Sequence, residues 1–498
     1  MPLFNIDLPP GVVADGQPYE VGTKGRWRLS NLVRWRNGLL QPVGGWVEVL
    51  GASHDVSHGP ARGVFPWRDN SLNRYLAFGT PGALYVHSDQ SPLKDITPDG
   101  MNIGRENSIF GAGFGFGSFG MEDFGTIRTS GTNQLDASTW SLDAWGGNLV
   151  AMMSSDGIVY EWEPGEAKAV PVNNAPTGLA LMVTSERHLV VLGTGQNGRL
   201  VAWSDRENNT VWTPVATNLA GDFELRTDGQ LITGVRARGE NVLITSRDAW
   251  AMRFLGAPLV YGFELLGRAC GAFSAQSVVS AGSFAAWMGP AGWHIYDGAL
   301  RPLRSTVLDY VFSDLNTSQS AKVVGGLNDR FNEIWWIYPS ADSNEPNRYV
   351  FWNYVDDYWA VGELERTSWA QEGVFVAPLL PGVDGKLYQH ETGYTANGEP
   401  VLGERFVESG EQSIDSGDNV MVVSRLIPDE RSLGETRATF TARFEPNGVA
   451  TEYGPYDPAK LTDMRFQGRQ VAVRIEGATD APWRVGTPRL DIKPGGMR

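Results

Sequence analysis

Residues 76–86 read LAFGTPGALYV, an apolar stretch, a turn with proline and glycine, and a second apolar stretch with an aromatic residue near its end. This arrangement predicts a β-hairpin, because short apolar runs bounded by turn residues are typical of buried strands. Long amphipathic helical patterns are nearly absent, so we predict an all-β fold. The same hairpin pattern returns in residues 150–162 (VAMMSSDGIVYEW), 189–203 (LVVLGTGQNGRLVAW), 242–252 (VLITSRDAWAM), 285–296 (AAWMGPAGWHIY), 334–352 (IWWIYPSADSNEPNRYVFW) and 376–390 (VAPLLPGVDGKLYQH).

The hairpins recur at a spacing typical of β-propellers. From Leu84 to Leu387, their second strands lie 38 to 56 residues apart, except for one step of 74 residues. Propeller blades repeat at roughly 40 to 50 residues, because four short antiparallel strands and their turns use that length of chain. We therefore predict that residues 61–398 form a β-propeller of about six or seven blades. The irregular spacing leaves a sandwich of unrelated hairpins as the alternative.

The two ends of the chain differ from this repeat region. Strand patterns alternate more regularly after residue 398, as in residues 438–444 (ATFTARF), so we predict a β-sandwich domain over residues 399–498. Residues 1–60 precede the first predicted blade and are expected to form an extended N-terminal arm and docking segment.

The composition limits the classes of function. The chain has 498 residues and a formal net charge of −16, of which residues 51–398 carry −14, because residues 1–50 sum to +1 and residues 399–498 to −3. This balance disfavours tight binding of free nucleic acid. A single cysteine, Cys270, excludes an intramolecular disulfide and a cysteine-based metal site. The N-terminus lacks the features of a secretory signal and no run of 18 apolar residues occurs, so we expect no membrane span.

Catalytic and cofactor motifs are missing from the sequence. The pair His54 and His58 has the spacing of two metal ligands on a helix, but its glycine, serine and proline neighbours predict a loop. Acidic residues near aromatic rings offer the carboxylates that a glycosidase needs, yet no signature singles out two of them. Residues 154–157 (SSDG) begin like a sialidase Asp-box but lack its closing Thr-Trp. We therefore predict no enzymatic activity, no catalytic residue, no cofactor and no metal.

A basic and aromatic strip stands out within the acidic chain. Residues 24–46 read KGRWRLSNLVRWRNGLLQPVGGW, in which arginines alternate with tryptophans. Arginine and tryptophan dominate the energetics of protein interfaces, so we predict that this strip docks onto another subunit or an adaptor protein. Packing across its own propeller is the alternative, and nucleic-acid binding is opposed by the acidic body. The predicted docking residues are Arg26, Trp27, Arg28, Arg34, Trp35, Arg36 and Trp46.

The long step in the repeat contains a glycine- and phenylalanine-rich insertion, residues 102–129. Aromatic rings on a glycine-rich backbone predict an exposed loop that acts as a gate or contacts a receptor. The alternative is that the rings pack onto the protein's own blades. The aromatic candidates are Phe110, Phe114, Phe116, Phe119 and Phe124.

Several segments of the sequence resemble those of one protein family. Residues 8–16 (LPPGVVADG) and 31–46 (NLVRWRNGLLQPVGGW) resemble the start of tail nozzle or packaged-DNA stabilisation proteins of short-tailed bacteriophages. Four later segments are similar to members of this group, namely residues 256–271 (GAPLVYGFELLGRACG), 332–338 (NEIWWIY), 364–369 (LERTSW) and 484–498 (RVGTPRLDIKPGGMR). This likeness is one of phrases and their order and involves no catalytic motif.

The resemblance implies a structural virion protein, made in the host cytoplasm and placed in the phage tail. Its expected assembly is a ring, commonly a homohexamer, that retains packaged DNA and conducts it during ejection. The implied partners are further copies of the chain, a tail adaptor, a tail fibre or spike, and the host surface. An acidic propeller segment suits a conduit that DNA passes without being gripped. A tail-associated carbohydrate-binding or glycan-cleaving propeller is the first alternative, and a cellular propeller scaffold is the second.

Overall fold

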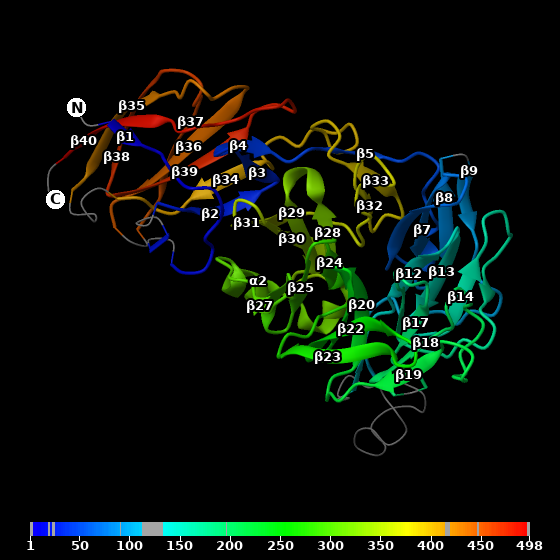
Figure 1. Cartoon of the computed structure of the whole chain (residues 1–498). Coiled ribbons are helices and arrows are strands. Elements are labelled where there is room, and N and C mark those ends of the chain that lie inside the picture. Colours follow the sequence, from blue (N-terminus) through cyan, green and yellow to red (C-terminus); the bar gives the residue numbers. More distant parts are fainter. Residues whose placement is uncertain are drawn as a thin grey trace, which may run out of the picture.

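The structure is a computed structural model that describes residues 3–17, 20–21, 25–89, 91–111, 133–195, 197–413, 419–445 and 448–495. Strands dominate throughout (Figure 1), and the predicted all-β class is confirmed. None of the described helices is long and apolar enough to cross a membrane. The helical elements are short, namely η1 (Val56–His58), η2 (Ala275–Ser277), α2 (Leu308–Asp314), η3 (Thr317–Lys322) and η4 (Asp329–Phe331).

Six consecutive four-stranded antiparallel sheets follow one another along the described chain, and in each the strands pair in sequence order. The first sheet contains β6 (Val64–Arg68), β7 (Arg74–Gly79), β8 (Leu84–Ser88) and β9 (Ser91–Asp95). The second contains β12 (Trp140–Trp145), β13 (Asn148–Met153), β14 (Val159–Trp162) and β15 (Val170–Pro171). The third contains β16 (Ala180–Val183), β17 (Leu189–Leu192), β18 (Leu200–Trp203) and β19 (Gly221–Glu224). The next three are β20 (Leu231–Ala237), β21 (Glu240–Thr245), β22 (Asp248–Gly256) and β23 (Val260–Arg268); β24 (Val278–Ser280), β25 (Ala285–Gly289), β26 (Gly292–Tyr296) and β27 (Leu300–Pro302); and β28 (Val324–Asn328), β29 (Glu333–Pro339), β30 (Pro346–Asn353) and β31 (Tyr358–Glu363).

The seventh sheet joins distant parts of the chain. It contains β32 (Leu379–Pro381), β33 (Leu387–His390) and β5 (Trp46–Glu48), and β5 pairs antiparallel with β33. On the other edge, Ala370 forms a bridge with Leu379. An N-terminal strand therefore completes the last sheet and closes the ring, so that the sheets leave no open end there.

The seven sheets face a common axis. One cavity is lined by residues of β6, β12, β16, β20, β24 and β28, together with residues 368, 369 and 371 before β32. Close packing between neighbouring sheets needs glycine at some positions: a Cβ atom on Gly79 of β7 would lie 2.4 Å from the Trp140 ring of the next sheet. This arrangement around an axis is a β-propeller, and it agrees with the predicted architecture.

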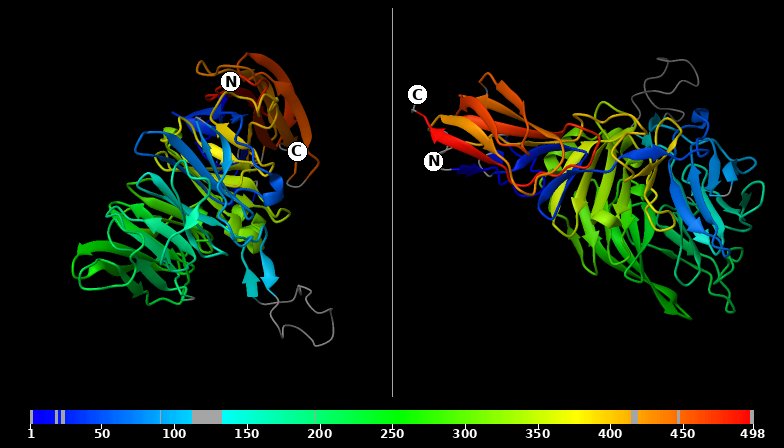
Figure 2. Two further views of the ribbon diagram at one scale, coloured as in Figure 1. Left: turned by 90° about the vertical axis from the view of Figure 1, so that its right-hand side faces the viewer. Right: turned by 90° about the horizontal axis from the view of Figure 1, so that it is seen from above.

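The C-terminal residues form a β-sandwich of two sheets. In β36 (Thr436–Arg443) buried residues alternate with more exposed ones, because one face of each sheet packs on the other sheet. The first sheet contains β1 (Leu3–Asn5), β40 (Arg489–Pro494), β35 (Met421–Ile427) and β38 (Thr462–Gly468), in that order. The second contains β2 (Trp27–Asn31), β34 (Phe406–Ser409), β39 (Gln470–Gly477), β36 (Thr436–Arg443) and β37 (Thr451–Tyr456). Figure 2 shows this sandwich at one end of the molecule, with both termini on it.

The N-terminal segment connects the two bodies and does not project as a free arm. Strands β1 and β2 belong to the sandwich, whereas β5 belongs to the propeller. Between them lies the hairpin of β3 (Val33–Arg36) and β4 (Leu39–Pro42). The segment is extended, as predicted, but its strands β1, β2 and β5 form their hydrogen bonds with strands of the same chain. The domain boundaries at residues 1–60, 61–398 and 399–498 stay predictions.

A short insertion precedes β12. Strands β10 (Ile109–Gly111) and β11 (Asn133–Leu135) pair antiparallel and form the described base of this insertion.

Candidate functional site

The axial cavity of the propeller is crossed by side chains at one end. The Gln276 side-chain amide donates to the carbonyl of Arg62, and Ser368 Oγ donates to Gln276 Oε1 at 3.0 Å. Arg62 precedes β6, Gln276 lies in η2 before β24, and Ser368 precedes β32, so the three residues come from the entries to three different sheets. Their hydrogen bonds join different sheets beside the axial cavity, whose lining includes Gln276 and Ser368.

The other end of the axis opens into a mouth of about 840 Å³. Carboxylates and aromatic rings line it, but its acids already have partners. Asp143 lies 3.2 Å from Arg236 and accepts a hydrogen bond from the Val183 amide at 2.8 Å. Burial raises the pKa of Asp143, and Arg236 opposes that shift. Glu372 accepts from the Arg330 amide at 2.9 Å. The lining of the mouth contains three acids and one arginine, so it stays acidic although Asp143 and Glu372 each have a partner.

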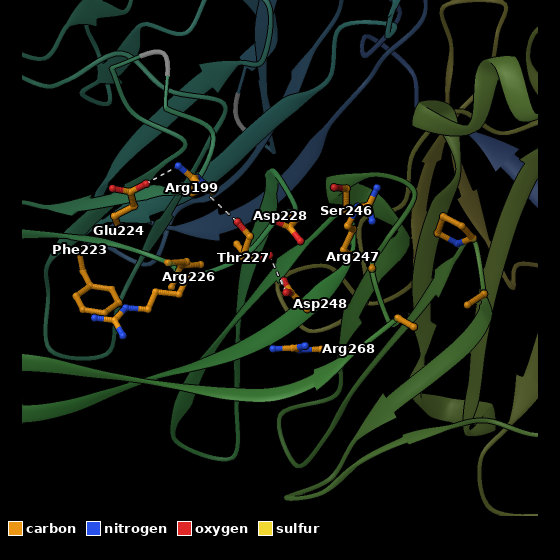
Figure 3. Close-up of a pocket in the computed structure, with 15 residues that line it drawn as sticks. Arg199, Phe223, Glu224, Arg226, Thr227, Asp228, Ser246, Arg247, Asp248 and Arg268 are labelled. Carbon is orange, nitrogen blue, oxygen red and sulfur yellow. Dashed lines mark hydrogen bonds and ion pairs between the residues drawn. The ribbon is translucent and has the colours of Figure 1, made fainter.

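A separate pocket of about 930 Å³ lies off the axis, between the third, fourth and fifth sheets (Figure 3). Its walls are connections that lie on one face of the propeller: the link from β19 to β20, the turn between β21 and β22, and the link from β23 to β24. The lining residues are Arg199, Phe223, Glu224, Leu225, Arg226, Thr227, Asp228, Ser246, Arg247, Asp248, Arg268, Ala269, Gly271, Pro290 and Ala291. We name this site the arginine pocket.

An aromatic platform stands at one side of the arginine pocket. Phe223 of β19 is 39% exposed, and its ring stacks on Phe263 of β23 with centroids 4.3 Å apart and planes 3° from parallel. Phe263 thus supports the ring, and Phe223 lines the pocket. An exposed aromatic ring fixed in this way offers an apolar face to a ligand.

The acids of the arginine pocket differ in what holds them. Glu224 pairs with Arg199 at 2.7 Å. Asp248 is buried and accepts hydrogen bonds from three side chains, those of Thr227 (2.7 Å), Thr245 (2.5 Å) and Trp250 (3.2 Å). Its carboxylate therefore organises the floor of the pocket.

Three arginines of the pocket have no acidic partner. In the described part of the chain, Arg226, Arg247 and Arg268 take part in no side-chain ion pair, and all three are exposed. Figure 3 shows them distributed around the pocket together with Arg199. Among the described residues these guanidinium groups have no carboxylate acceptor, so the pocket suits a ligand that carries oxygen acceptors.

Our sequence reasoning missed this pocket. Arg226 and Arg247 lie two residues after the ends of β19 and β21, and Arg268 is the last residue of β23. Because alternate strands of a meander end at the same face, an arginine at each of these ends was the available signal.

Three of the predicted docking residues are buried within the chain, which corrects that part of the prediction. Arg34 is 1% exposed, Trp27 5% and Trp35 4%. The Trp35 amide donates to the Tyr358 hydroxyl at 3.1 Å, and that hydroxyl donates to the Trp35 carbonyl at 2.8 Å. These side chains face the propeller and the sandwich of their own chain, so they are not available to a partner. Packing across the protein's own propeller, our alternative, describes them.

The remaining docking candidates have different surroundings. Trp46 is half-buried, and its ring stacks on His390 with centroids 5.3 Å apart. Arg26 and Arg28 are half-buried and Arg36 is exposed. Docking through Arg26, Arg28, Arg36 and Trp46 stays a prediction.

The predicted contact loop falls mostly outside the described residues. This holds for Phe114, Phe116, Phe119 and Phe124, whereas Phe110 lies on β10. The described base of the insertion is anchored to η3: the Gln134 side chain donates to the Ser318 carbonyl at 2.6 Å, and the Ser108 amide donates to Gln319 Oε1 at 3.1 Å. The loop's role as gate or receptor contact stays a prediction.

A buried charged cluster secures the same region. Lys322 Nζ donates to Asn107 Oδ1 at 2.6 Å and to Glu345 Oε1 at 2.8 Å, and Arg62 pairs with the same Glu345 oxygen at 2.6 Å. Burial lowers the pKa of Lys322 to about 8. The cluster links the insertion to the first and sixth sheets and has a structural role.

The remaining titratable candidates are occupied by structural contacts. His54 lies 3.2 Å from the Gly59 carbonyl and His58 2.5 Å from the Tyr85 hydroxyl. Within the described ranges, no three histidine, cysteine or acidic side chains are grouped to hold a metal ion. Burial raises the pKa of Cys270 to about 11, so this thiol is protonated at neutral pH.

Comparisons with known proteins returned solved structures alone: no family model and no curated protein matches the chain. One similar structure is exo-β-1,3-galactanase from Phanerochaete chrysosporium, at 11% identity and a TM-score of 0.30, covering 91% of this chain and 100% of that one. Virginiamycin B lyase from Staphylococcus aureus matches at 8% identity and 0.36, covering 69% and 97%. YCF48 from Cyanidioschyzon merolae matches at 8% and 0.35, covering 70% and 98%. Likenesses of this size assign no substrate and no reaction to this chain.

The prediction that this chain is not an enzyme is contradicted by these comparisons. Glycoside hydrolases are among the similar structures, the galactanase being one of them. We therefore withdraw that prediction. Charged side chains and aromatic rings line both the arginine pocket and the axial mouth, so these two pockets are the candidate ligand sites on the described chain.

Proposed function

We propose that this protein is a tail-associated β-propeller that binds carbohydrate in the arginine pocket. The observation that carries the proposal is the Phe223 ring, backed by Phe263 and open to a pocket of about 930 Å³. Sugars present a C–H face that packs on an aromatic ring and hydroxyl groups at the rim. The pocket supplies both kinds of partner, because polar side chains surround the ring.

The polar side chains of the pocket suit sugar hydroxyls. Ser246 and Asp228 are exposed there, and Asp228 offers carboxylate oxygens as acceptors. The exposed arginines offer N–H donors. Convergent donors and acceptors beside an apolar surface are the usual composition of a small-ligand site.

Replacing Phe223 by alanine is expected to weaken binding of an oligosaccharide by about tenfold, because the sugar loses the aromatic ring on which it stacks and the apolar area buried there. Isothermal titration with ligands selected from an array of bacterial surface oligosaccharides measures this. Phe254→Ala is the matched control: Phe254 is also 39% exposed, but it lies outside the pocket.

The same titration mixtures show whether bound glycan is cleaved, through the release of shorter oligosaccharides. A protein that binds no oligosaccharide of the array contradicts the proposal. Equal losses in the Phe223 and Phe254 variants also contradict it, because the pocket would then have no special part in binding.

A second candidate function is the tail nozzle subunit that the sequence resemblance implies. The net charge of −14 in residues 51–398 supports it, since a conduit for DNA must not hold phosphates. The fixed junction of propeller and sandwich also supports it, because a ring needs rigid subunits. The docking residues left for this role are exposed Arg36 and half-buried Arg26, Arg28 and Trp46.

The nozzle candidate predicts that the purified chain forms closed rings, with six copies as the expected number. Mass photometry at rising protein concentration, followed by negative-stain microscopy, measures this. Arg36→Glu should shift the population toward monomers, because the charge reversal lies on an exposed strand end. Monomers at every concentration, in the presence of the tail adaptor as well, would exclude this candidate.

A further inference from the structure

We infer that the arginine pocket selects saccharides that carry an oxyanion, either a carboxylate or a phosphate ester. This inference rests on the proposed carbohydrate binding and names its ligand class. Arg226, Arg247 and Arg268 carry it: they come from three different connections, line one pocket, and have no acidic partner in the described chain.

The pocket is locally basic within an acidic protein. Its lining contains four arginines and three acids, whereas the whole chain has a net charge of −16. Glu224 is engaged with Arg199 at 2.7 Å, and Asp248 is engaged by three hydroxyl or indole donors. Asp228 is the remaining acid, set against three arginines. The charge left over is positive, and a negative ligand would satisfy it.

Arginine is suited to oxyanions by its shape. The guanidinium group presents N–H donors in a planar fork that matches the two oxygens of a carboxylate or a phosphate. A neutral sugar would leave most of these donors in contact with water. An anionic sugar would use them together while its ring packs on Phe223.

The walls that carry the arginines are held in place before any ligand arrives. The Thr227 hydroxyl donates to Asp248 at 2.7 Å, which ties the link after β19 to the start of β22. On the opposite wall, a Cβ atom on Gly289 would lie 1.7 Å from the Gly271 carbonyl oxygen, so the backbones of these two connections touch. A site that is ordered in advance loses less entropy when it binds.

The test compares charged and neutral ligands on the full chain. The probes are an oligosaccharide of galacturonic acid, a phosphorylated mannan oligosaccharide, and a neutral galactose oligosaccharide of equal length. The tested protein carries Arg226→Gln, Arg247→Gln and Arg268→Gln together. The control protein carries Arg431→Gln, Arg437→Gln and Arg465→Gln, which remove the same charge from exposed positions of the sandwich.

In the unaltered protein, at least one charged probe is expected to bind at least about tenfold more tightly than the neutral probe, and its affinity should fall with added salt. The pocket variant should lose this preference and the control variant should keep it. Preference for the uronate identifies a carboxylate ligand, and preference for the phosphorylated probe identifies a phosphate ester. Melting curves of both variants establish that each is folded.

Two failures are distinguishable. Equal binding of charged and neutral probes, or a preference that survives in the pocket variant, overturns the oxyanion selection while carbohydrate binding stands. Absence of binding by every probe and by every oligosaccharide of the array overturns the proposed function and this inference with it.

Discussion

Replacing Arg34 by methionine is expected to lower the free energy of unfolding by about 3–5 kcal/mol, the usual cost of removing one partner from a buried ion pair. Arg34 of β3 donates to both carboxylate oxygens of Glu333 at 2.8 and 2.9 Å, and to both oxygens of Glu391 at 2.5 and 3.0 Å. Its guanidinium carbon also lies 3.7 Å from the centre of the Phe331 ring. One side chain thus ties the N-terminal hairpin to the sixth sheet and to the end of the seventh.

The loss should depend on pH, and the sign follows from the two glutamates. Burial raises the pKa of Glu333 to about 7, although Arg34 opposes the shift. Burial also pushes the pKa of Glu391 upward, but Arg34 and its other donors bring it below the usual value. Without Arg34 the pKa of Glu333 rises further, and that of Glu391 rises above the unfolded value of about 4.3. The variant then loses stability as pH rises from about 4.3 through those values, so its deficit is larger at pH 8 than at pH 5.

Urea unfolding at pH 5 and pH 8 measures the free energy of unfolding of both proteins. Arg36→Met is the matched control, because Arg36 lies on the same strand but is exposed. Adding Glu333→Gln to the Arg34 variant should recover part of the loss at pH 8. A deficit below about 1 kcal/mol, the level of a surface pair, or one that is equal at both pH values, would mean that this cluster does not stabilise the junction.

Deletion of residues 1–45 is expected to abolish cooperative folding. The deleted segment supplies β1 and β2 to the two sheets of the sandwich and contributes Trp27, Val33 and Trp35 to a core cluster shared with the propeller. Burial of one such side chain contributes about 1.5–3 kcal/mol, so the loss of several approaches the total stability of about 5–15 kcal/mol expected for a domain.

The measurement is the solubility of the shortened chain and its thermal unfolding. Deletion of residues 1–5 is the control, since it removes only the edge strand β1, which pairs with β40 alone. A chain starting at residue 46 that stays soluble and unfolds cooperatively would restore the sequence-based view of a separable arm.

The fold was largely predictable because its signals are local. Apolar runs separated by glycines predict the strands and turns of hairpins such as residues 76–86 and 285–296, and the structure has β7–β8 and β25–β26 there. The closure of the ring was not predictable in this way. Strand β5 pairs with β33, more than three hundred residues later, and no local pattern specifies such a partner.

The buried part of the basic and aromatic strip, Trp27, Arg34 and Trp35, was misread for a related reason. Composition identified residues that form interfaces, but it does not say whether the partner surface belongs to another chain. The partners of Arg34 are Glu333 and Glu391, separated from it by 299 and 357 positions. The arginine pocket escaped sequence analysis because Arg226, Arg247 and Arg268 gather only once the sheets stand side by side.

A crystal structure of the protein with a bound oligosaccharide of galacturonic acid would show whether the arginine pocket holds the sugar by its oxyanion. We predict a sugar ring packed on Phe223 and a carboxylate within hydrogen-bonding distance of at least two of Arg226, Arg247 and Arg268. A saccharide bound in the axial mouth beside Asp143, or one whose carboxylate points into solvent, would contradict it.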